Sequence, residues 1–232
     1  MKRITKAPDE RRNELITTAN QLFFTKGYEA TSVNDIVKAV GVAKGTFYHY
    51  FESKTAVLEA LVDNMMSENA KIMDVIVDED GPTALEKWHK LFEMVGSWKL
   101  EHKPELLELA KFMRRDDNAL MTKKFEEKSK NIASPRITKI IQQGIDEGVF
   151  KTSFAKETAE VIFSLNSGVS QSIVPILLNP EQYDDPLDLL RRKFAAIQAA
   201  LERILDAPPG TMKFVNEENL AEWYDYLEES RE

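Results

Sequence analysis

The sequence predicts an all-α protein, and three observations support this prediction. Apolar residues recur at spacings of three and four in a series of long segments, as they do on the buried side of an amphipathic helix. Proline, glycine and helix-capping residues stand between these segments. The chain has 232 residues, of which 43% are hydrophobic and 30% charged, and this composition suits a folded globular protein of one or two domains.

The first predicted helix runs from about Pro8 or Asp9 to Lys26, and Gly27 ends it. The inward-facing side of this helix consists of Leu15, Ile16, Ala19, Leu22 and Phe23. Residues 2–7 precede the helix as a short basic arm. This arm either lies along a nucleic-acid backbone or is a frayed chain end, and the sequence leaves both readings open.

The next stretch predicts two short helices joined by a tight turn. Thr31 or Ser32 caps the first of them, and Asp35 stands three residues after Ser32, the spacing of a capping box. The apolar stripe of this helix is Val33, Ile36, Val37 and Val40. Gly41 then supplies the positive φ that a turn of three or four residues requires. The pattern is a helix-turn-helix at about residues 32–51.

The second helix of this motif, which starts near Ala43, is aromatic on one side and small and polar on the other. A helical wheel separates an inward set, Phe47, Tyr50 and Phe51, from an outward set, Gly45, Thr46, Tyr48 and His49. A DNA major groove accepts such an outward face, because little bulk blocks the approach and the polar groups reach phosphates or base edges. The predicted DNA contacts are Thr31, Ser32, Lys44, Gly45, Thr46, Tyr48, His49 and Lys54. The alternative is a helical hairpin whose aromatic residues all belong to the core.

Residues 9–62 resemble the DNA-binding domain of the TetR family of bacterial transcriptional regulators. The first helix ends in LFFTKGYEATSV, the motif reads DIVKAVGVAKGTFYHYF, and SKTAVLEAL follows. The residues that match in one register are Gly27, Tyr28, Thr31, Ile36, Gly41, Val42, Gly45, Phe47, Tyr48, Tyr50, Phe51 and Lys54. The resemblance implies a homodimeric repressor whose divergent, all-helical C-terminal domain binds a small molecule and then releases DNA.

The distribution of charge agrees with a DNA-binding head. The net charge of −8 argues at first against a nucleic-acid partner. Residues 1–56, however, hold nine Lys or Arg against six Asp or Glu, or +3, while the remaining residues hold 22 against 33, or −11. A basic head on an acidic body suits DNA binding by one face only.

The remaining chain predicts seven more helices. They run at about residues 54–77, 83–101, 104–113, 119–147, 155–178, 186–206 and 216–230. Ser53 caps the first of them, a long connecting helix. The helix at 104–113 is apolar on most sides, so we expect it to be buried. In the helix at 119–147, Ser134 and Pro135 predict a kink or a restart.

The twenty residues from Val161 to Pro180 carry no charge, and a segment of this length is long enough to span a membrane. Seven of them are Ser, Asn or Gln, too many for a lipid-facing helix, so we expect burial between proteins and no membrane partner. The small residues Ser167, Gly168 and Ser170 allow close helix approach. We expect a homodimer through the helices at about 155–178 and 186–206, as the resemblance also implies.

The last predicted helix lies beyond the minimal family pattern. Asn216 caps it, and its apolar stripe includes Trp223, which we expect to pack against the body or a partner subunit.

A small-molecule effector needs a pocket, and the predicted body supplies large apolar side chains with a few polar ones to orient a ligand. The predicted pocket residues are Trp88, Phe92, Trp98, His102, Phe112, Met113, Phe163, Asn166 and Gln171. Each of them also fits a plain core position. An apolar or amphipathic ligand agrees with this composition.

No catalytic or metal-binding pattern stands out. The chain has no cysteine, its three histidines lie far apart, and it contains neither a glycine-rich phosphate loop nor a GxSxG turn. We therefore expect no cofactor, no metal and no enzymatic activity. The absence of cysteine fits a reducing compartment, and the N-terminal residues lack the apolar segment of a secretory signal, so we expect a cytoplasmic protein.

The sequence thus predicts a DNA-binding domain at residues 1–55, a ligand-binding and dimerisation domain at 56–210, and an acidic amphipathic helix within 211–232. The predicted function is a homodimeric transcriptional repressor that a small apolar or amphipathic ligand releases from a palindromic double-stranded DNA operator. The alternative is a helical small-molecule carrier or enzyme with a vestigial DNA-binding head. These sequence patterns do not distinguish an activator from a repressor.

Overall fold

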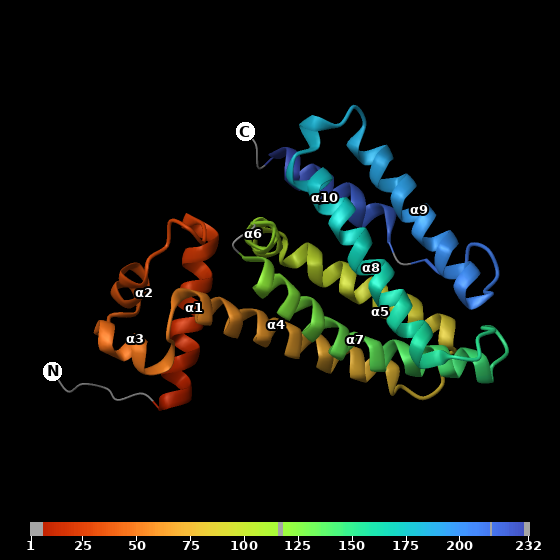
Figure 1. Cartoon of the computed structure of the whole chain (residues 1–232), viewed down its shortest axis with the longest axis horizontal. Coiled ribbons are helices and arrows are strands. Elements are labelled where there is room, and N and C mark those ends of the chain that lie inside the picture. The colour runs from red at the N-terminus through yellow and green to blue at the C-terminus, as the bar shows by residue number, and fades with distance from the viewer. Residues whose placement is uncertain (1–6, 116–117, 214, 230–232) are drawn as a thin grey trace. The chain divides into compact units, whose positions relative to one another are not determined.

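The computed structural model in Figure 1 describes three stretches of the chain, residues 7–115, 118–213 and 215–229. Within these stretches the regular structure is entirely helical, which confirms the all-α prediction. Residues 2–6 of the predicted basic arm lie outside the described residues, so the reading of this arm stays a prediction.

The chain divides into two compact units, Met1–Glu68 and Asn69–Glu232. The division falls inside helix α4, Lys54–Val77, which therefore contributes residues to both units. The predicted boundaries at 55/56 and 210/211 divide the chain by expected role, and that division remains a proposal.

The first unit contains three helices before α4. They are α1 (Pro8–Lys26), α2 (Val33–Val40) and α3 (Lys44–Tyr50). Helix α1 packs against α2, and α2 against α3. The core of this unit includes Leu15, Ile16, Ala19, Phe23, Ile36, Phe47 and Phe51, all buried. The helix bounds and this core follow the sequence prediction closely, because both depend on local periodicity.

The caps of α2 are formed by the predicted residues. The Ser32 hydroxyl accepts a hydrogen bond from the backbone N–H of Asp35 at 3.2 Å, and the Asp35 carboxylate accepts one from the N–H of Ser32 at 2.8 Å. At the other end Gly41 adopts φ 76°, and its N–H donates to the carbonyl of Val37 at 2.9 Å. The left-handed conformation of this glycine starts the turn into α3.

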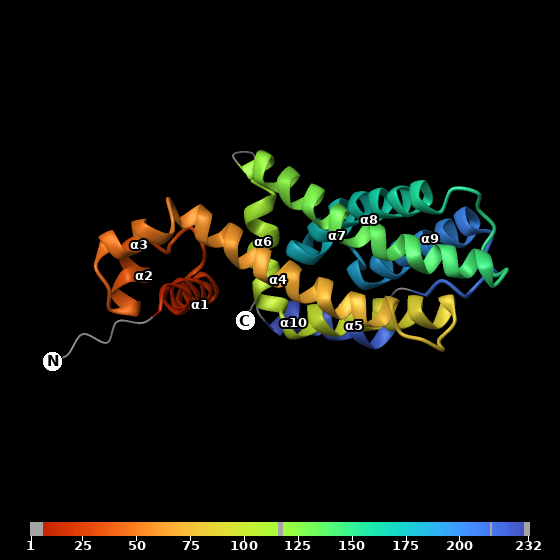
Figure 2. The same cartoon turned by 90° about the horizontal axis from the view of Figure 1, so that it is seen from below.

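The second unit consists of the end of α4 and the helices that follow it. They are α5 (Ala84–Glu101), α6 (Lys103–Met113), α7 (Ala119–Asp146), α8 (Ala155–Leu178), the 3-10 turn η2 (Pro180–Gln182), α9 (Pro186–Leu205) and α10 (Glu217–Glu229). Helix α7 packs on α5 and α8, α9 packs on α8, and α10 packs on both α5 and α8. Figure 2 shows α10 running beside α5.

The core of the second unit lies between these helices. Its fully buried side chains include Trp88, Ile140, Ile141, Phe150, Ile176, Leu190 and Leu205. Phe150 lies so close to the backbone of α7 that a Cβ atom on Gly144 would collide with its ring. The absence of a side chain at Gly144 therefore lets the chain after α7 fold back onto that helix.

Helix α7 corrects part of one expectation. Ser134 and Pro135 were expected to produce a kink or a restart, but α7 does not restart there and runs as one helix from Ala119 to Asp146. A proline inside a helix removes one backbone hydrogen bond. Two neighbouring side chains donate to carbonyls of that turn, Thr138 to Ser134 at 2.8 Å and Arg136 to Ile132 at 2.5 Å.

Helix α6 corrects another. Its apolar sequence predicted burial on most sides, yet only Phe112 is buried and the other apolar residues of the helix are half-buried. Helix α6 packs on α5, α7 and α8, and these contacts do not surround it. Composition alone therefore overestimated how much of this helix the chain covers.

Helix α8 is the one described helix whose length and composition would also suit a membrane span, with a mean hydropathy of 1.6 over its most apolar window. Core helices of globular proteins pass the same test. Helix α8 packs on α7 and α9, yet only 19% of that window is buried within the chain.

Helix α10 packs on the body, as its apolar stripe predicted. Two ion pairs join α10 to the body: Glu222 of α10 pairs with Lys103 at 2.6 Å, and Glu217 of α10 pairs with Arg191 at 3.0 Å. Asn216 caps it through a hydrogen bond that its side-chain oxygen accepts from the N–H of Glu218 at 2.9 Å.

Candidate nucleic-acid interface and ligand cavity

Helix α3 is held by its aromatic side and exposes the other. Phe47 is 0% exposed and Phe51 4%, and their ring centroids lie 5.9 Å apart in the core of the first unit. This anchoring fixes the rotation of α3 about its own axis. As a result Tyr48, with 50% of its surface exposed, and His49 face solvent.

The beginning of α3 carries little bulk. Gly45 is exposed, and a Cβ atom placed on it would meet no other atom within 4 Å. Lys44 is exposed beside it, with its ammonium 5.9 Å from the centre of the Tyr48 ring. Thr46 is half-buried. A flat, partly cationic surface with one phenol and one imidazole suits the edge of a DNA groove.

Ser32 lies at the exposed N-terminus of α2, but its hydroxyl already has partners. It donates to the Asp35 carboxylate at 2.7 Å, and Lys26 donates to the same carboxylate at 2.8 Å. The Lys26 ammonium and the Ser32 hydroxyl together hold the pKa of Asp35 well below its usual range. The free N–H groups of a helix N-terminus attract phosphate, so Ser32 stays a predicted contact through this end of α2.

The structure contradicts the predicted DNA contact by Thr31. Its side chain is 1% exposed, and its hydroxyl donates to the carbonyl of Gly27 at 2.8 Å and of Leu22 at 3.2 Å. A buried hydroxyl with two backbone partners closes the end of α1 and is not available to a ligand. The threonine of the family motif is therefore a structural residue here.

Lys54 also has partners inside the first unit. Its ammonium donates to the carbonyl of Tyr28 at 2.7 Å and lies 4.0 Å from the centre of the Tyr28 ring. The side chain is half-buried. A phosphate contact by Lys54 stays a prediction, and the structure adds a role in holding the loop after α1.

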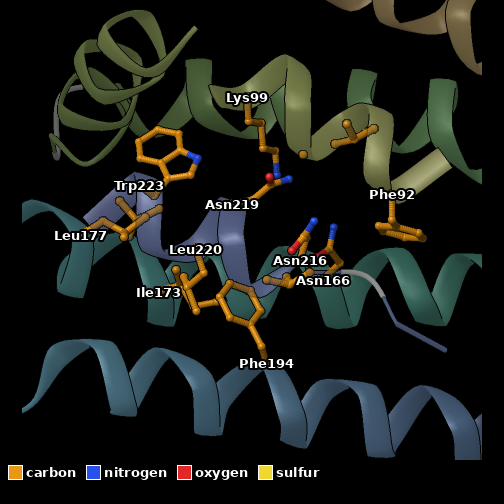
Figure 3. Close-up of a pocket in the computed structure, with 14 residues that line it drawn as sticks. Phe92, Lys99, Asn166, Ile173, Leu177, Phe194, Asn216, Asn219, Leu220 and Trp223 are labelled. Carbon is orange, nitrogen blue, oxygen red and sulfur yellow. The ribbon is translucent and has the colours of Figure 1, made fainter. Parts of the chain in front are cut away.

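The second unit contains a cavity of about 240 Å³ between α5, α8, α9 and the segment that leads into α10 (Figure 3). Its fourteen lining residues are Phe92, Val95, Gly96, Lys99, Asn166, Ile173, Val174, Leu177, Phe194, Val215, Asn216, Asn219, Leu220 and Trp223. One is charged, three are asparagines and the others are apolar or glycine. Such a lining suits a mostly apolar ligand with a polar end.

A second cavity of about 160 Å³ shares three residues with the first, Phe92, Val95 and Asn166. Its other lining residues are Met73, Leu91, Ala133, Ile137, Ile162, Phe163, Leu165, Ile197 and Leu201. This smaller space has no charged side chain in its lining. The shared residues place the two cavities next to each other.

Of the nine predicted pocket residues, Phe92 and Asn166 line both cavities and Phe163 lines the smaller one. The other six are Trp88, Trp98, His102, Phe112, Met113 and Gln171, and they line neither. Trp88 is fully buried in the core, where its ring centroid lies 4.6 Å from that of Phe92. His102 stacks on Trp98 at 4.4 Å and contacts its carbonyl through Nδ1 at 2.9 Å.

Sequence reasoning missed Lys99 and every lining residue from the C-terminal segment. One signal was present for Lys99, because it continues the spacing of Phe92, Val95 and Gly96 on one face of α5. For the C-terminal segment the stripe containing Trp223 predicted packing, but no local pattern showed that it would line a cavity. Among the described residues there is no cluster of acidic or histidine side chains that could hold a metal ion.

A helix-turn-helix with an anchored, outwardly polar second helix, followed in the chain by an all-helical unit, is the architecture of a DNA-binding transcriptional regulator. Residues 15–61 match the family model described as bacterial regulatory proteins, tetR family. The helix-turn-helix domain of this chain is that of the TetR family, as its resemblance indicated.

Relatives of known sequence agree with this assignment. YuxN, an uncharacterized HTH-type transcriptional regulator of Bacillus subtilis, is 30% identical over 163 residues, which are 70% of this chain and 53% of YuxN. The regulator EthR of Mycolicibacterium smegmatis is 41% identical over 58 residues, 25% of this chain and 27% of EthR. Matches to four curated relatives cover between 27% and 61% of the length of those proteins.

The fold extends the likeness to the whole chain. The crystal structure of a TetR-family transcriptional regulator from Pectobacterium atrosepticum superposes with a TM-score of 0.63. The match covers 88% of this chain and 100% of the other at 22% sequence identity. At this identity the comparison establishes the shared fold.

Proposed function

We propose that the protein is a homodimeric repressor that binds a palindromic operator through α3 and leaves it when a small apolar or amphipathic ligand binds the second unit. The exposed face of α3, held outward by the buried Phe47, carries this proposal. Two such helices in a dimer would enter major grooves about 34 Å apart, one turn of DNA. A cytoplasmic location is part of the same proposal.

The predicted dimer surface has support in the burial of α8. Only 19% of its most apolar window is buried within the single chain, and Val161 is 54% exposed. A Cβ atom on Gly168 would meet no atom within 4 Å. An accessible apolar helix with a bare glycine offers a second copy a close approach.

Release of DNA by a ligand requires coupling between the two sites. A ligand that favours a body conformation with a different spacing of the heads lowers DNA affinity, and DNA lowers ligand affinity by the same factor. Such coupling is typically about 1–3 kcal/mol. Helix α4 contributes to both units and is the natural element to carry it.

The test is selection of binding sites from a random pool of duplex DNA, followed by a salt titration of the selected site. We expect a palindromic site and a steep fall of affinity with salt. Tyr48→Ala and His49→Ala should weaken binding to the selected site, whereas Gln21→Ala, an exposed residue of α1, should not. No enrichment at low salt, with the dimer shown to be folded, would contradict the regulator and favour a carrier or enzyme that uses the cavity.

A further inference from the structure

The cavity of about 240 Å³ contains one charge, and that charge lacks a partner among the described residues. Lys99 is the one charged residue among its fourteen lining residues. No hydrogen bond or ion pair joins its ammonium to another described residue. Figure 3 shows the side chain extending from α5 toward Asn219, into the space between the helices.

Two acidic residues of the neighbouring helix α10 pair with other residues. Glu222 pairs with Lys103 at 2.6 Å, and Glu217 pairs with Arg191 at 3.0 Å. Neither lines the cavity of about 240 Å³, although Glu217 lines an adjoining hollow of about 830 Å³ that shares Phe92, Val215 and Asn216 with it. Helix α10 is acidic, yet the face that it turns to the cavity is neutral, so Lys99 remains without an internal counter-ion there.

Lys99 has a crowded surrounding and an exposed surface at the same time. The protein atoms around Lys99 displace water, and this desolvation lowers the pKa of Lys99. The residue as a whole is nevertheless exposed in the single chain, so water still reaches it. A bound anion would pair with the ammonium, and the attraction between the two charges would strengthen as the ligand displaces water from the cavity.

We propose that this cavity binds a small amphiphile with a single anionic group, which pairs with Lys99 while the apolar part lies against Phe194, Leu220 and Trp223. This inference rests on the proposed function, in which the bound anion is the effector. A volume of about 240 Å³ is below the roughly 300–1,000 Å³ of pockets for drug-sized molecules, so the ligand is small.

Asn219 supplies a second polar contact for the anion. A Cβ atom on Gly96 would lie 2.8 Å from Nδ2 of Asn219, so the glycine makes room for this amide beside α5. An amide N–H and an ammonium that approach the same space form a suitable pair of donors for a carboxylate.

The C-terminal segment is then part of the binding site. Five lining residues come from residues 215–223: Val215, Asn216, Asn219, Leu220 and Trp223. We expect ligand binding to slow amide hydrogen exchange in α10, because the ligand adds contacts to a helix that closes one wall of the cavity.

Three probes with the same chain and different ends separate charge from apolar burial: decanoate, decanol and decylamine. Binding to the full-length protein is measured by calorimetry and by Trp fluorescence. We expect decanoate to bind at least about tenfold more tightly than decanol, and decylamine to bind most weakly. Lys99→Met should remove the preference for decanoate and leave decanol binding unchanged, whereas Lys99→Arg should keep the preference.

Lys90→Met is the matched control, since Lys90 lies on the same helix, is exposed, and pairs with Glu79 outside the cavity. Equal binding of decanoate and decanol, unchanged decanoate binding in a folded Lys99→Met protein, or no binding of any probe would overturn the assignment. Operator binding is measured in parallel with the wild-type protein. Lys99-dependent decanoate binding without DNA binding would contradict the proposed repressor and support the anion site. DNA binding without Lys99-dependent decanoate binding would support the proposed repressor and contradict the anion site.

Discussion

The ammonium of Lys54 donates to the carbonyl oxygen of Tyr28 at 2.7 Å and lies 4.0 Å from the centre of the same residue's ring. The Tyr28 hydroxyl shares a hydrogen bond of 3.0 Å with Thr55, the next residue of α4. The chain just after α1 is thus fastened to the first turn of α4. The two lysines near α3 consequently differ, since Lys44 is exposed and Lys54 is engaged.

Replacing each lysine by methionine should separate these roles. Lys54→Met should lower the free energy of unfolding by about 1–3 kcal/mol, because a charge-assisted hydrogen bond is lost. Lys44→Met should leave stability within about 0.5 kcal/mol and flatten the salt dependence of DNA binding by about one unit of slope. Thermal unfolding and salt titrations measure the two effects. Equal stability of both variants would show that the Lys54 contacts contribute nothing.

Gly45 and Gly41 should respond differently to alanine. A methyl group on Gly45 meets nothing within 4 Å, so Gly45→Ala should keep or raise stability by up to about 1 kcal/mol. It should weaken operator binding about tenfold, because the added group stands where the backbone approaches DNA. Gly41→Ala should instead destabilise by roughly 1–2 kcal/mol, since φ is 76° there. Undiminished operator affinity in Gly45→Ala would argue against the assigned face.

Asp35 should make the stability of α2 depend on pH. Its pKa is lowered in the folded protein, so its stabilising contribution is present above the unfolded pKa of about 3.9 and is lost as the pH falls through the folded pKa. Asp35→Asn should therefore speed amide exchange in α2 at neutral pH, and the difference from the wild type should shrink below about pH 4. A difference that is independent of pH would assign the effect to the cap geometry alone.

Gly168 should report on the dimer. Gly168→Arg should convert the dimer to monomers while each chain stays folded, because the new side chain meets no atom of its own chain near the Cβ position. Sedimentation and circular dichroism measure both properties. Ser153→Arg places the same side chain at an exposed position before α8 and should remain dimeric. A dimeric Gly168→Arg protein would move the interface elsewhere.

Most helix bounds were predictable because their signals are local. Ser53 accepts a hydrogen bond from the N–H of Ala56 in the first turn of α4, as its position in the sequence predicted. The same local reasoning predicted a kink or a restart at Ser134 and Pro135, and the restart did not occur. The side chains of Thr138 and Arg136 donate to the carbonyls of Ser134 and Ile132, whereas the carbonyl that loses its donor at Pro135 is that of Asn131, so these two bonds do not replace the missing one.

The two candidate sites also differ in how far the sequence predicted them. The sequence by itself determined the outward face of α3 and its anchoring at Phe47, since helical periodicity assigns both sides of one helix. Only the tertiary structure decided that Thr31 is buried and that Lys99 and Trp223, which are far apart in the chain, line one cavity. Periodicity tells which side of a helix is covered but not which segment covers it, so a cavity formed by α5, α8, α9 and the C-terminal segment follows only from packing.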